Sequence, residues 1–161
     1  MSSARLVVGL GAPDRGDDAV GLEVARRVAQ LKLPGVAVVE HEDPTGLIEL
    51  WSDCELVVVI DAVCSGSAPG SVLVMEAGPG TAPLAENAWA HTGRGGTHAF
   101  GLAAAVELGR ALHHLPGRLV LVGVEASQFE HGSALGEPVA AAVDSVVATV
   151  VELVAAAAPV P

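Results

Sequence analysis

The chain has 161 residues, of which 51% are hydrophobic and 2% aromatic, so it fits one domain whose core must be aliphatic. Its formal net charge of −11 excludes a nucleic-acid-binding protein, because phosphate contacts require concentrated lysine and arginine. No uninterrupted apolar run reaches the ~20 residues of a membrane-spanning helix, so we expect no membrane partner.

The apolar pattern switches repeatedly between strand-like and helix-like periods along the chain. In chain order it predicts a strand at 5–10, a helix at 17–33, a strand at 36–40, a short helix at 45–52, strands at 56–60 and 71–76, a helix at 98–115, a strand at 118–125 and a helix at 137–157. Thr45 is expected to cap the short helix. Residues 77–97 are rich in Gly, Pro and Ala without a clear period, which indicates a functional loop or a segment whose structure the pattern does not reveal.

This alternation of strands and helices predicts an α/β fold. We expect a single domain over residues 1–161, with three α/β/α layers and a twisted, mostly parallel sheet of about five strands. Valine-rich strands suit a sheet that helices cover on both faces. The sequence contains no domain linker or internal repeat.

Acidic residues follow three of the predicted strands, in the loops at 14–18 and 42–43 and at Asp61. Ligands of an open α/β sheet bind beyond the carboxyl ends of the strands, where these acids are expected. A single aspartate in such a place is ordinarily a turn or helix cap, and we expect Asp61 to close its strand at the surface. Several acids at one sheet edge nevertheless favour a functional site.

One histidine stands apart from the others by its position. His98 lies between the glycine-rich stretch and a predicted helix, where the chain can bring an imidazole to the edge that carries the acids. An isolated histidine there would ordinarily be a cap or a loop residue. His113 and His114 are expected in the last turn of a helix, where they complement its dipole.

A dinucleotide site is poorly supported. The segment Gly9-Leu10-Gly11 matches the start of the G-x-G-x-x-G fingerprint, but Asp14 occupies the place of the third glycine. Asp17 and Asp18 would also repel a pyrophosphate at the helix N-terminus. We therefore expect no nucleotide cofactor.

Covalent catalysis is poorly supported as well. Cys54 and Cys64 are too few for a disulfide framework or a cysteine metal cluster, and neither has a basic neighbour in the sequence that would favour a thiolate. No G-x-S-x-G motif supplies a serine nucleophile. The N-terminal residues lack a signal-peptide pattern, so we expect a reduced, cytoplasmic protein.

Six segments, taken together and in order, resemble the signatures of the hydrogenase maturation proteases. They are Gly-Leu-Gly-Ala-Pro-Asp-Arg-Gly-Asp-Asp-Ala-Val-Gly at 9–21, Asp-Pro-Thr-Gly-Leu at 43–47, Val-Ile-Asp-Ala-Val at 59–63, His-Ala-Phe-Gly-Leu at 98–102, Val-Gly-Val-Glu at 122–125 and Pro-Val-Ala at 138–140. The resemblance covers nearly the whole chain. It implies a twisted sheet between helices, as the periodicity does.

The resemblance also implies an activity. Members of this family cut a short C-terminal extension from the precursor of a nickel–iron hydrogenase large subunit after nickel has been inserted. The residues that contact the metal in the family carry over onto Asp18, Asp61 and His98, which are therefore the expected catalytic and metal-contacting residues. Two carboxylates and an imidazole suit a borderline divalent ion, and we expect that ion to be the nickel of the substrate. Their reactive atoms should lie within about 5 Å of one another.

Ala12 departs from the family pattern, which usually has asparagine at this position. If that amide orients a ligand or the scissile peptide, its loss lowers activity or changes the substrate. The alternative to a peptidase is a non-catalytic module, derived from the same family, that binds a nickel-loaded precursor without cutting it. We expect a monomer in either case.

Overall fold

The structure, a computed structural model, describes residues 5–81 and 98–156, apart from the side chains of 98–100. The described strands are β1 (Arg5–Leu10), β2 (Val36–His41), β3 (Leu56–Val63), β4 (Val72–Glu76) and β5 (Arg118–Glu125). The described helices are η1 (Gly16–Ala19), α1 (Val20–Gln30), η2 (Pro44–Gly46), α2 (Leu47–Trp51), α4 (His98–Ala111) and α5 (Glu137–Ala156), where η marks a 3₁₀ helix. The predicted alternation of strands and helices is confirmed.

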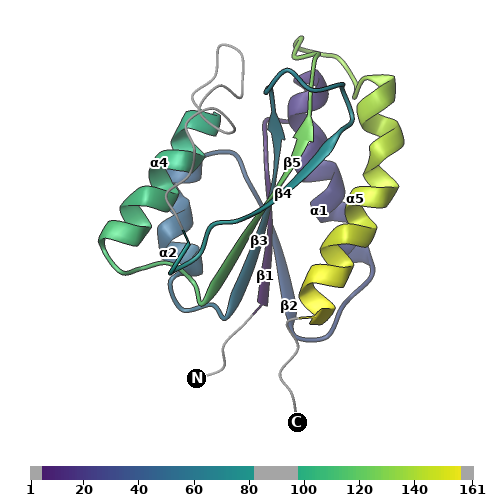
Figure 1. The fold of residues 1–161 in the computed structure, drawn as a ribbon. Coiled ribbons are helices and arrows are strands. Elements are labelled where there is room, and N and C mark those ends of the chain that lie inside the picture. The colour runs from purple at the N-terminus through teal and green to yellow at the C-terminus, as the bar shows by residue number, and fades with distance from the viewer. Residues whose placement is uncertain (1–4, 82–97, 157–161) are drawn as a thin grey trace.

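The strands form one sheet in the order β2-β1-β3-β5-β4. All neighbours pair in parallel except β4, which runs antiparallel to β5 at one edge. Helices α1 and α5 cover one face of the sheet, and α2 and α4 cover the other (Figure 1). The expected mostly parallel sheet of about five strands between helices is therefore confirmed.

Side-chain alternation along β3 decides which helices its residues meet. Val58 and Ile60 belong to the valine-rich cluster under α1 and α5. Val59 and Val63 belong to the second cluster, under α2 and α4. Asp61 lies between those two in the alternation, so its carboxylate faces the α2–α4 side of the sheet.

Two glycines allow the start of α1 to approach the carboxyl ends of the central strands. A Cβ at Gly9 of β1 would collide with the carbonyl oxygen of Gly21, and one at Gly21 would collide with the carbonyls of Leu10 and Ile60. Only residues without a side chain fit this contact. It holds η1, which precedes α1, directly above β1 and β3.

Several boundaries differ from the sequence-based expectations. The predicted helix at 17–33 starts as η1 and ends at Gln30. Asp43, rather than Thr45, caps η2, and it accepts the backbone N–H of Thr45 at 3.0 Å. Helix α4 ends at Ala111, so His113, with a φ of 59°, lies beyond its last turn. Residues 82–97, most of the glycine-rich stretch, lie outside the described residues.

Helix α5 is long and apolar enough to cross a membrane by length and composition, with a mean hydropathy of 1.8 over Glu137–Ala155. Its valines at 139, 143, 146, 150 and 154 are buried in the cluster shared with α1 and the sheet. This spacing of three or four residues is that of a helix with one face in a protein core. The packing therefore accounts for the five buried valines, which lie on one face of α5.

Candidate active site

Asp61 is deeply buried, with 1% of its surface exposed. It lies within β3, which continues to Val63, so the expectation that it closes its strand at the surface is wrong. Its Oδ1 accepts the backbone N–H of Ala62 at 2.9 Å. Its Oδ2 is buried and accepts no hydrogen bond from the described residues. An orphaned carboxylate oxygen in a protein interior is costly, so this atom needs a proton or a cation.

The electrostatics of Asp61 point the same way. Burial raises the pKa of its carboxyl group well above the ordinary value, and the nearby charge of Asp18 raises this pKa further. The hydrogen bond from Ala62 opposes these two effects but is the smallest of the three. Without a cation, the carboxyl group of Asp61 therefore tends to keep its proton.

Asp18 lies in η1, above the carboxyl end of β1, and is 4% exposed. Its Oδ2 accepts the backbone N–H of Ala12 at 3.2 Å. This contact uses the main chain of residue 12, so it does not depend on having asparagine there. Asp18 lies close enough to Asp61 for its charge to raise the pKa of that carboxyl group.

The third predicted residue, His98, is the first residue of α4, and its side chain lies outside the described residues. The first turn of α4 lies at the carboxyl edge of the sheet, beside η2 (Figure 1). Gly101 marks this contact, because a Cβ there would lie 3.2 Å from Cγ of Pro44. The main chain therefore starts α4 at the edge that holds Asp18 and Asp61. The convergence of all three side chains stays a prediction, and no three potential ligands cluster among the described side chains.

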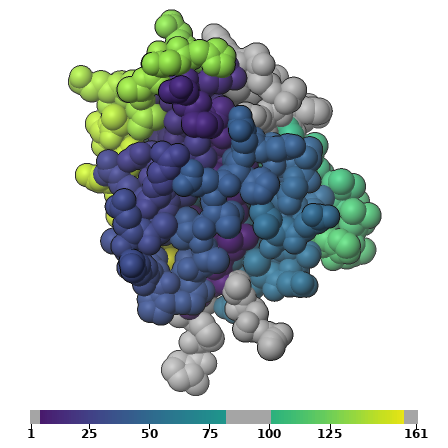
Figure 2. All heavy atoms as spheres, turned by 180° about the vertical axis from the view of Figure 1, so that it is seen from behind, coloured from purple at the N-terminus to yellow at the C-terminus, as the bar shows by residue number. Residues whose placement is uncertain are grey.

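The other acids of this edge serve the fold. Asp17 accepts three backbone N–H groups, from Ser127 and Gln128 at 3.0 Å each and from Gly136 at 2.7 Å. It thereby ties η1 to the segment 126–136 that links β5 to α5. Figure 2 shows this edge at the top, with the first loop in dark purple beside the 126–136 segment in green.

Glu125 is a buried acid to which the sequence assigned no role. It ends β5 and is 4% exposed. Its carboxylate accepts the N–H groups of Ser65 and Gly66 at 2.8 and 3.2 Å and the Ser65 hydroxyl at 2.6 Å. Glu125 therefore fixes the loop that follows β3. The signal for it was an acid that ends a wholly apolar strand, which is the same signal that identified Asp61.

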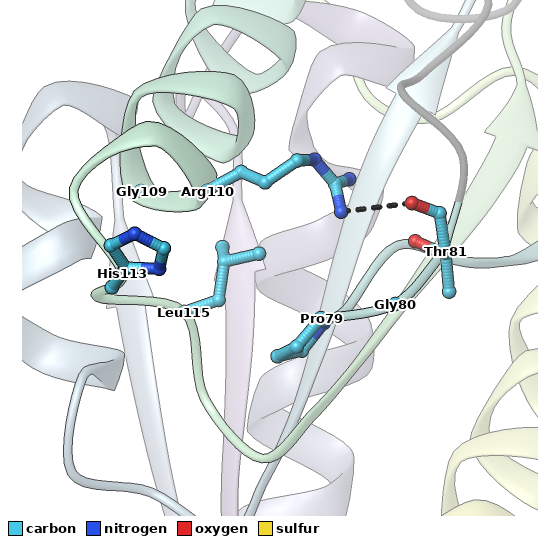
Figure 3. Close-up of a pocket in the computed structure, with 7 residues that line it drawn as sticks. All are labelled: Pro79, Gly80, Thr81, Gly109, Arg110, His113 and Leu115. Atoms are coloured by element: carbon cyan, nitrogen blue, oxygen red, sulfur yellow. Dashed lines mark hydrogen bonds between the residues drawn. The ribbon is translucent and has the colours of Figure 1, made fainter.

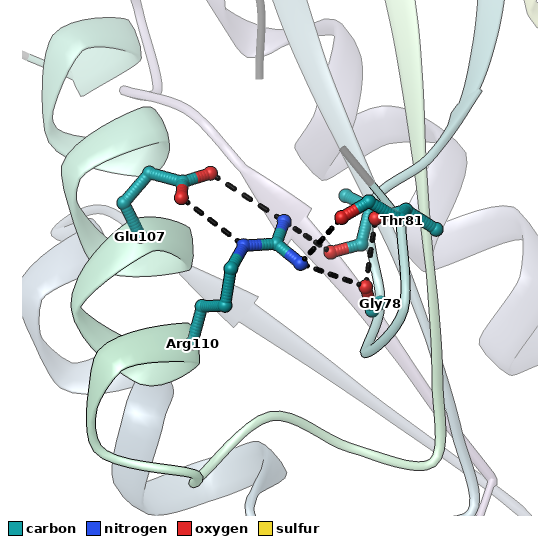
Figure 4. A network of polar contacts seen from close by, with 5 residues as sticks. Gly78, Thr81, Glu107 and Arg110 are labelled. Atoms are coloured by element: carbon teal, nitrogen blue, oxygen red, sulfur yellow. Dashed lines mark hydrogen bonds and ion pairs between the residues drawn. The ribbon is translucent and has the colours of Figure 1, made fainter. Parts of the chain in front are cut away.

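One cavity of the described structure lies at the end of α4 and is far from the buried acids. A cavity of about 410 Å³ lies between the end of α4 and residues 79–81, at the opposite end of α4 from His98 (Figure 3). There Arg110 donates to the carbonyls of Ala77, Gly78 and Thr81 and pairs with Glu107 (Figure 4). These bonds anchor the chain after β4 to α4, and they leave this cavity remote from the acids.

A second cavity of about 410 Å³ adjoins the acidic edge. It lies between η2–α2 and α4, with Pro44, Ile48 and Leu108 among its apolar walls and Asp43 at its rim. It opens beside the first turn of α4, where His98 stands. A peptide chain could reach the acidic edge from this side.

The environment of Cys54 does not favour a nucleophilic thiolate. Burial, with a smaller contribution from the charge of Asp53, raises the pKa of the Cys54 thiol. Its Sγ donates to the carbonyl of Leu50 at 3.5 Å. This environment agrees with the sequence, which gives Cys54 no basic neighbour that would favour a thiolate.

Comparison with known proteins gives a consistent result. Residues 42–153 match the model of a family described as hydrogenase maturation protease. This span holds Asp61 and His98 but not Asp18. No curated protein sequence matches the chain.

Solved structures share the fold. The hydrogenase maturating endopeptidase HybD from E. coli is 22% identical, with a TM-score of 0.76 over 93% of this chain and 91% of that one. A [NiFe] hydrogenase maturation protease HycI from Thermococcus kodakarensis is 23% identical, with a TM-score of 0.67 over 93% and 91%. At these identities the likeness establishes the fold and leaves the activity to be argued from the residues.

Proposed function

This chain belongs to the hydrogenase maturation protease family, and from that premise we propose that it is an endopeptidase that removes a C-terminal extension from a nickel-loaded precursor of a hydrogenase large subunit. Members of the family process such precursors and use the nickel of the substrate. We further propose that the protein works as a single-domain monomer in the cytoplasm.

One observation carries the proposal to this chain. The Oδ2 atom of Asp61 is buried without a hydrogen-bond partner among the described residues, and the charge of Asp18 lies close enough to raise the pKa of Asp61. An orphaned carboxylate oxygen of Asp61 beside the charge of Asp18 is unfavourable, and a divalent cation would offset the repulsion and give that oxygen a partner. The donor set therefore fits an ion that arrives with the substrate.

In this proposal the chain's own residues bind and orient. Asp18, Asp61 and His98 contact the ion that the precursor presents, and an ion of this kind can polarise a peptide carbonyl or a water molecule. Water is the attacking group, because Cys54 is disfavoured as a thiolate and the sequence has no serine motif. The burial of Asp61 suits it to hold a proton until the ion arrives.

The test compares nickel-loaded precursor with metal-free precursor. Purified protein, treated with chelator, is mixed with each form, and the loss of the C-terminal extension is followed on a gel. We expect cleavage of the loaded form alone. Equal cleavage of both forms would contradict nickel sensing and indicate an ordinary peptidase.

The non-catalytic module is the second candidate, and the alanine at position 12 is the observation that favours it. Binding of the loaded precursor without cleavage would support this candidate. In that case Ala12→Asn is the first variant to make. Gain of cleavage in Ala12→Asn would show that the missing amide, rather than the acids, limits the reaction.

A further inference from the structure

Strand β4 ends the sheet, and no other strand of the described residues pairs with its outer edge. Edge strands of natural sheets are commonly blunted by charges, prolines or covering segments. The opposite edge, β2, carries Glu40, which pairs with Arg26 at 3.1 Å. On β4, by contrast, Val72, Leu73 and Val74 are 38%, 37% and 46% exposed, and its one charged residue, Glu76, is paired with Arg118 at the far end.

The backbone groups of this edge can be assigned from the hydrogen bonds to β5. The N–H of Glu125 donates to the carbonyl of Ser71, and the N–H of Ala77 donates to the carbonyl of Leu119, each at 2.8 Å. In an antiparallel pair alternate residues bond to the same neighbour, so odd-numbered positions of β4 face β5. The N–H and C=O groups of Val72, Val74 and Glu76 therefore point away from the sheet.

This edge is in register with the candidate active site. Leu73 pairs with Gly123 of β5, and Gly123 pairs with Asp61 of β3. Paired residues of neighbouring strands share a face, so Leu73 and Asp61 lie on the same side with only a glycine between them. At about 4.8 Å per strand, a chain added beyond β4 would lie about 15 Å from Asp61, which four or five extended residues can span.

A cavity of about 330 Å³ lies on this path, at the start of β4. Val63 and Leu73 give it apolar walls, and the hydroxyl-bearing Ser65, Ser67 and Ser71 line it as well. Val63 is the next residue after Asp61 on the same face of β3. The cavity, which the buried Glu125 also lines, therefore extends from the edge strand to the residue that follows Asp61 on the same face of β3.

The charges indicate what fits this surface. Residues 62–75 contain no charged side chain, although the whole chain has a net charge of −11. An uncharged, extended peptide can dock there without removing a charge from water. A second copy of the chain is a poorer occupant, because two such acidic molecules repel one another and a five-residue strand buries far less than the roughly 1,000 Å² of a stable interface.

We propose that β4 recognises the precursor by strand addition: an uncharged, extended segment within about five residues of the scissile bond pairs with the outer edge of β4 and places a side chain in the cavity beside Leu73. This inference rests on the proposed function for the identity of the peptide. It adds the surface that selects the peptide and the position of the recognised segment.

The first test is the variant Val74→Pro, with Val74→Thr as its matched control. Proline removes the outward N–H of residue 74 and blocks pairing, while edge positions of this kind tolerate it. Threonine keeps the backbone donor and the β-branched shape. We expect Val74→Pro to raise KM for nickel-loaded precursor at least tenfold with little change in kcat, and Val74→Thr to behave as wild type. Equal kinetics for the two variants would overturn the proposal while leaving the peptidase function standing.

The second test does not need cleavage. Amide hydrogen exchange is measured on the Asp61→Asn protein, alone and with nickel-loaded precursor. We expect the amides of Val72, Val74 and Glu76 to exchange rapidly alone and to become protected by the precursor. Precursor that binds the Asp61→Asn protein, as shown by co-elution, but leaves these amides unprotected would overturn the proposal. Protection that grows with protein concentration without precursor would identify a second copy as the occupant, which also overturns it.

Discussion

Asp17 and Asp18 are neighbours with the same side chain, yet their carboxylates have different partners. Asp17 binds three main-chain N–H groups of the 126–136 segment, whereas Asp18 accepts one from Ala12 and lies near Asp61. Consecutive residues of a 3₁₀ helix such as η1 are about a third of a turn apart, which separates the two directions. The sequence could predict an acidic cluster here, but only the positions of β5 and β3 decide which acid supports the fold and which faces the site.

This division predicts that substitution of Asp17, unlike that of an exposed acid at the same edge, lowers stability. Asp17→Ala should lower the free energy of unfolding by about 2–4 kcal/mol, because three charge-assisted hydrogen bonds are lost together. Glu42→Ala is the control on the same edge, since Glu42 is exposed, and it should change stability by less than about 0.5 kcal/mol. Urea unfolding of the three proteins measures this. Similar stability for Asp17→Ala and wild type would show that the Asp17 bonds add nothing.

Asp61→Asn separates charge from shape at the site. The amide has the size of the carboxylate but is a poorer ligand for a divalent cation. Loss of a group that only supports a metal ligand costs about 10–100-fold, so loss of a direct contact should slow processing by about 100-fold or more. The measurement is the rate of extension loss from nickel-loaded precursor at equal protein concentration. If Asp61→Asn processes precursor as fast as wild type, the carboxylate does not contact the ion.

At the scale of elements, the site depends on how closely α1 approaches the sheet. Gly9 and Gly21 leave room for main-chain atoms alone between β1, β3 and the helix. This contact sets the height of η1, and so of Asp18, over β3. The sequence placed Gly9 in a predicted strand and Gly21 in a predicted helix, but the reason for these glycines is a tight helix–strand contact that becomes visible only once the two elements are packed.

Gly21→Ala should therefore disturb both stability and activity. The added Cβ meets the carbonyl oxygens of Leu10 and Ile60, which belong to strands and cannot move aside. We expect a loss of about 1–3 kcal/mol in the free energy of unfolding, with slower processing at temperatures where the protein remains folded. The control is Gly46→Ala, whose Cβ would lie 3.3 Å from Cε1 of the His41 ring, a side chain that can shift. Equal stability for the two variants would mean that α1 tolerates displacement.

For the whole molecule, periodicity was enough to predict the order of elements and the parallel sheet, because valine-rich strands and amphipathic helices have distinct repeats. It misplaced Asp61, because β3 runs past the aspartate to Val63 and buries it. Strand propensity alone does not predict a charged residue such as Asp61 inside a strand. Burying a carboxylate costs free energy, and in the proposed function a cation offsets that cost. The structural role of Glu125 was not predicted for a related reason: its hydrogen-bond partner Ser65 lies 60 residues away in the sequence.

The burial of Asp61 also makes a prediction for the stability of the whole protein without metal. The folded pKa of this carboxyl group lies well above its unfolded value, which is about 4. Below about pH 4 both states hold the proton and Asp61 carries no penalty. As the pH rises through the window between the two pKa values, the unfolded chain releases the proton while the folded protein keeps it, so stability falls.

Asparagine cannot ionise, so Asp61→Asn should escape this loss. The measured quantity is the free energy of unfolding of Asp61→Asn minus that of wild type, both in chelator. This difference should be larger at about pH 8 than at about pH 5 by more than about 1 kcal/mol, since each pKa unit is equivalent to about 1.4 kcal/mol. Urea unfolding of both proteins across this range gives the difference directly, and groups that titrate alike in the two proteins cancel. A difference that stays constant with pH would mean that Asp61 is already ionised in the folded protein. The cation would then not be needed to neutralise a buried acid, and the electrostatic basis of the metal site would fail even if the fold were correct.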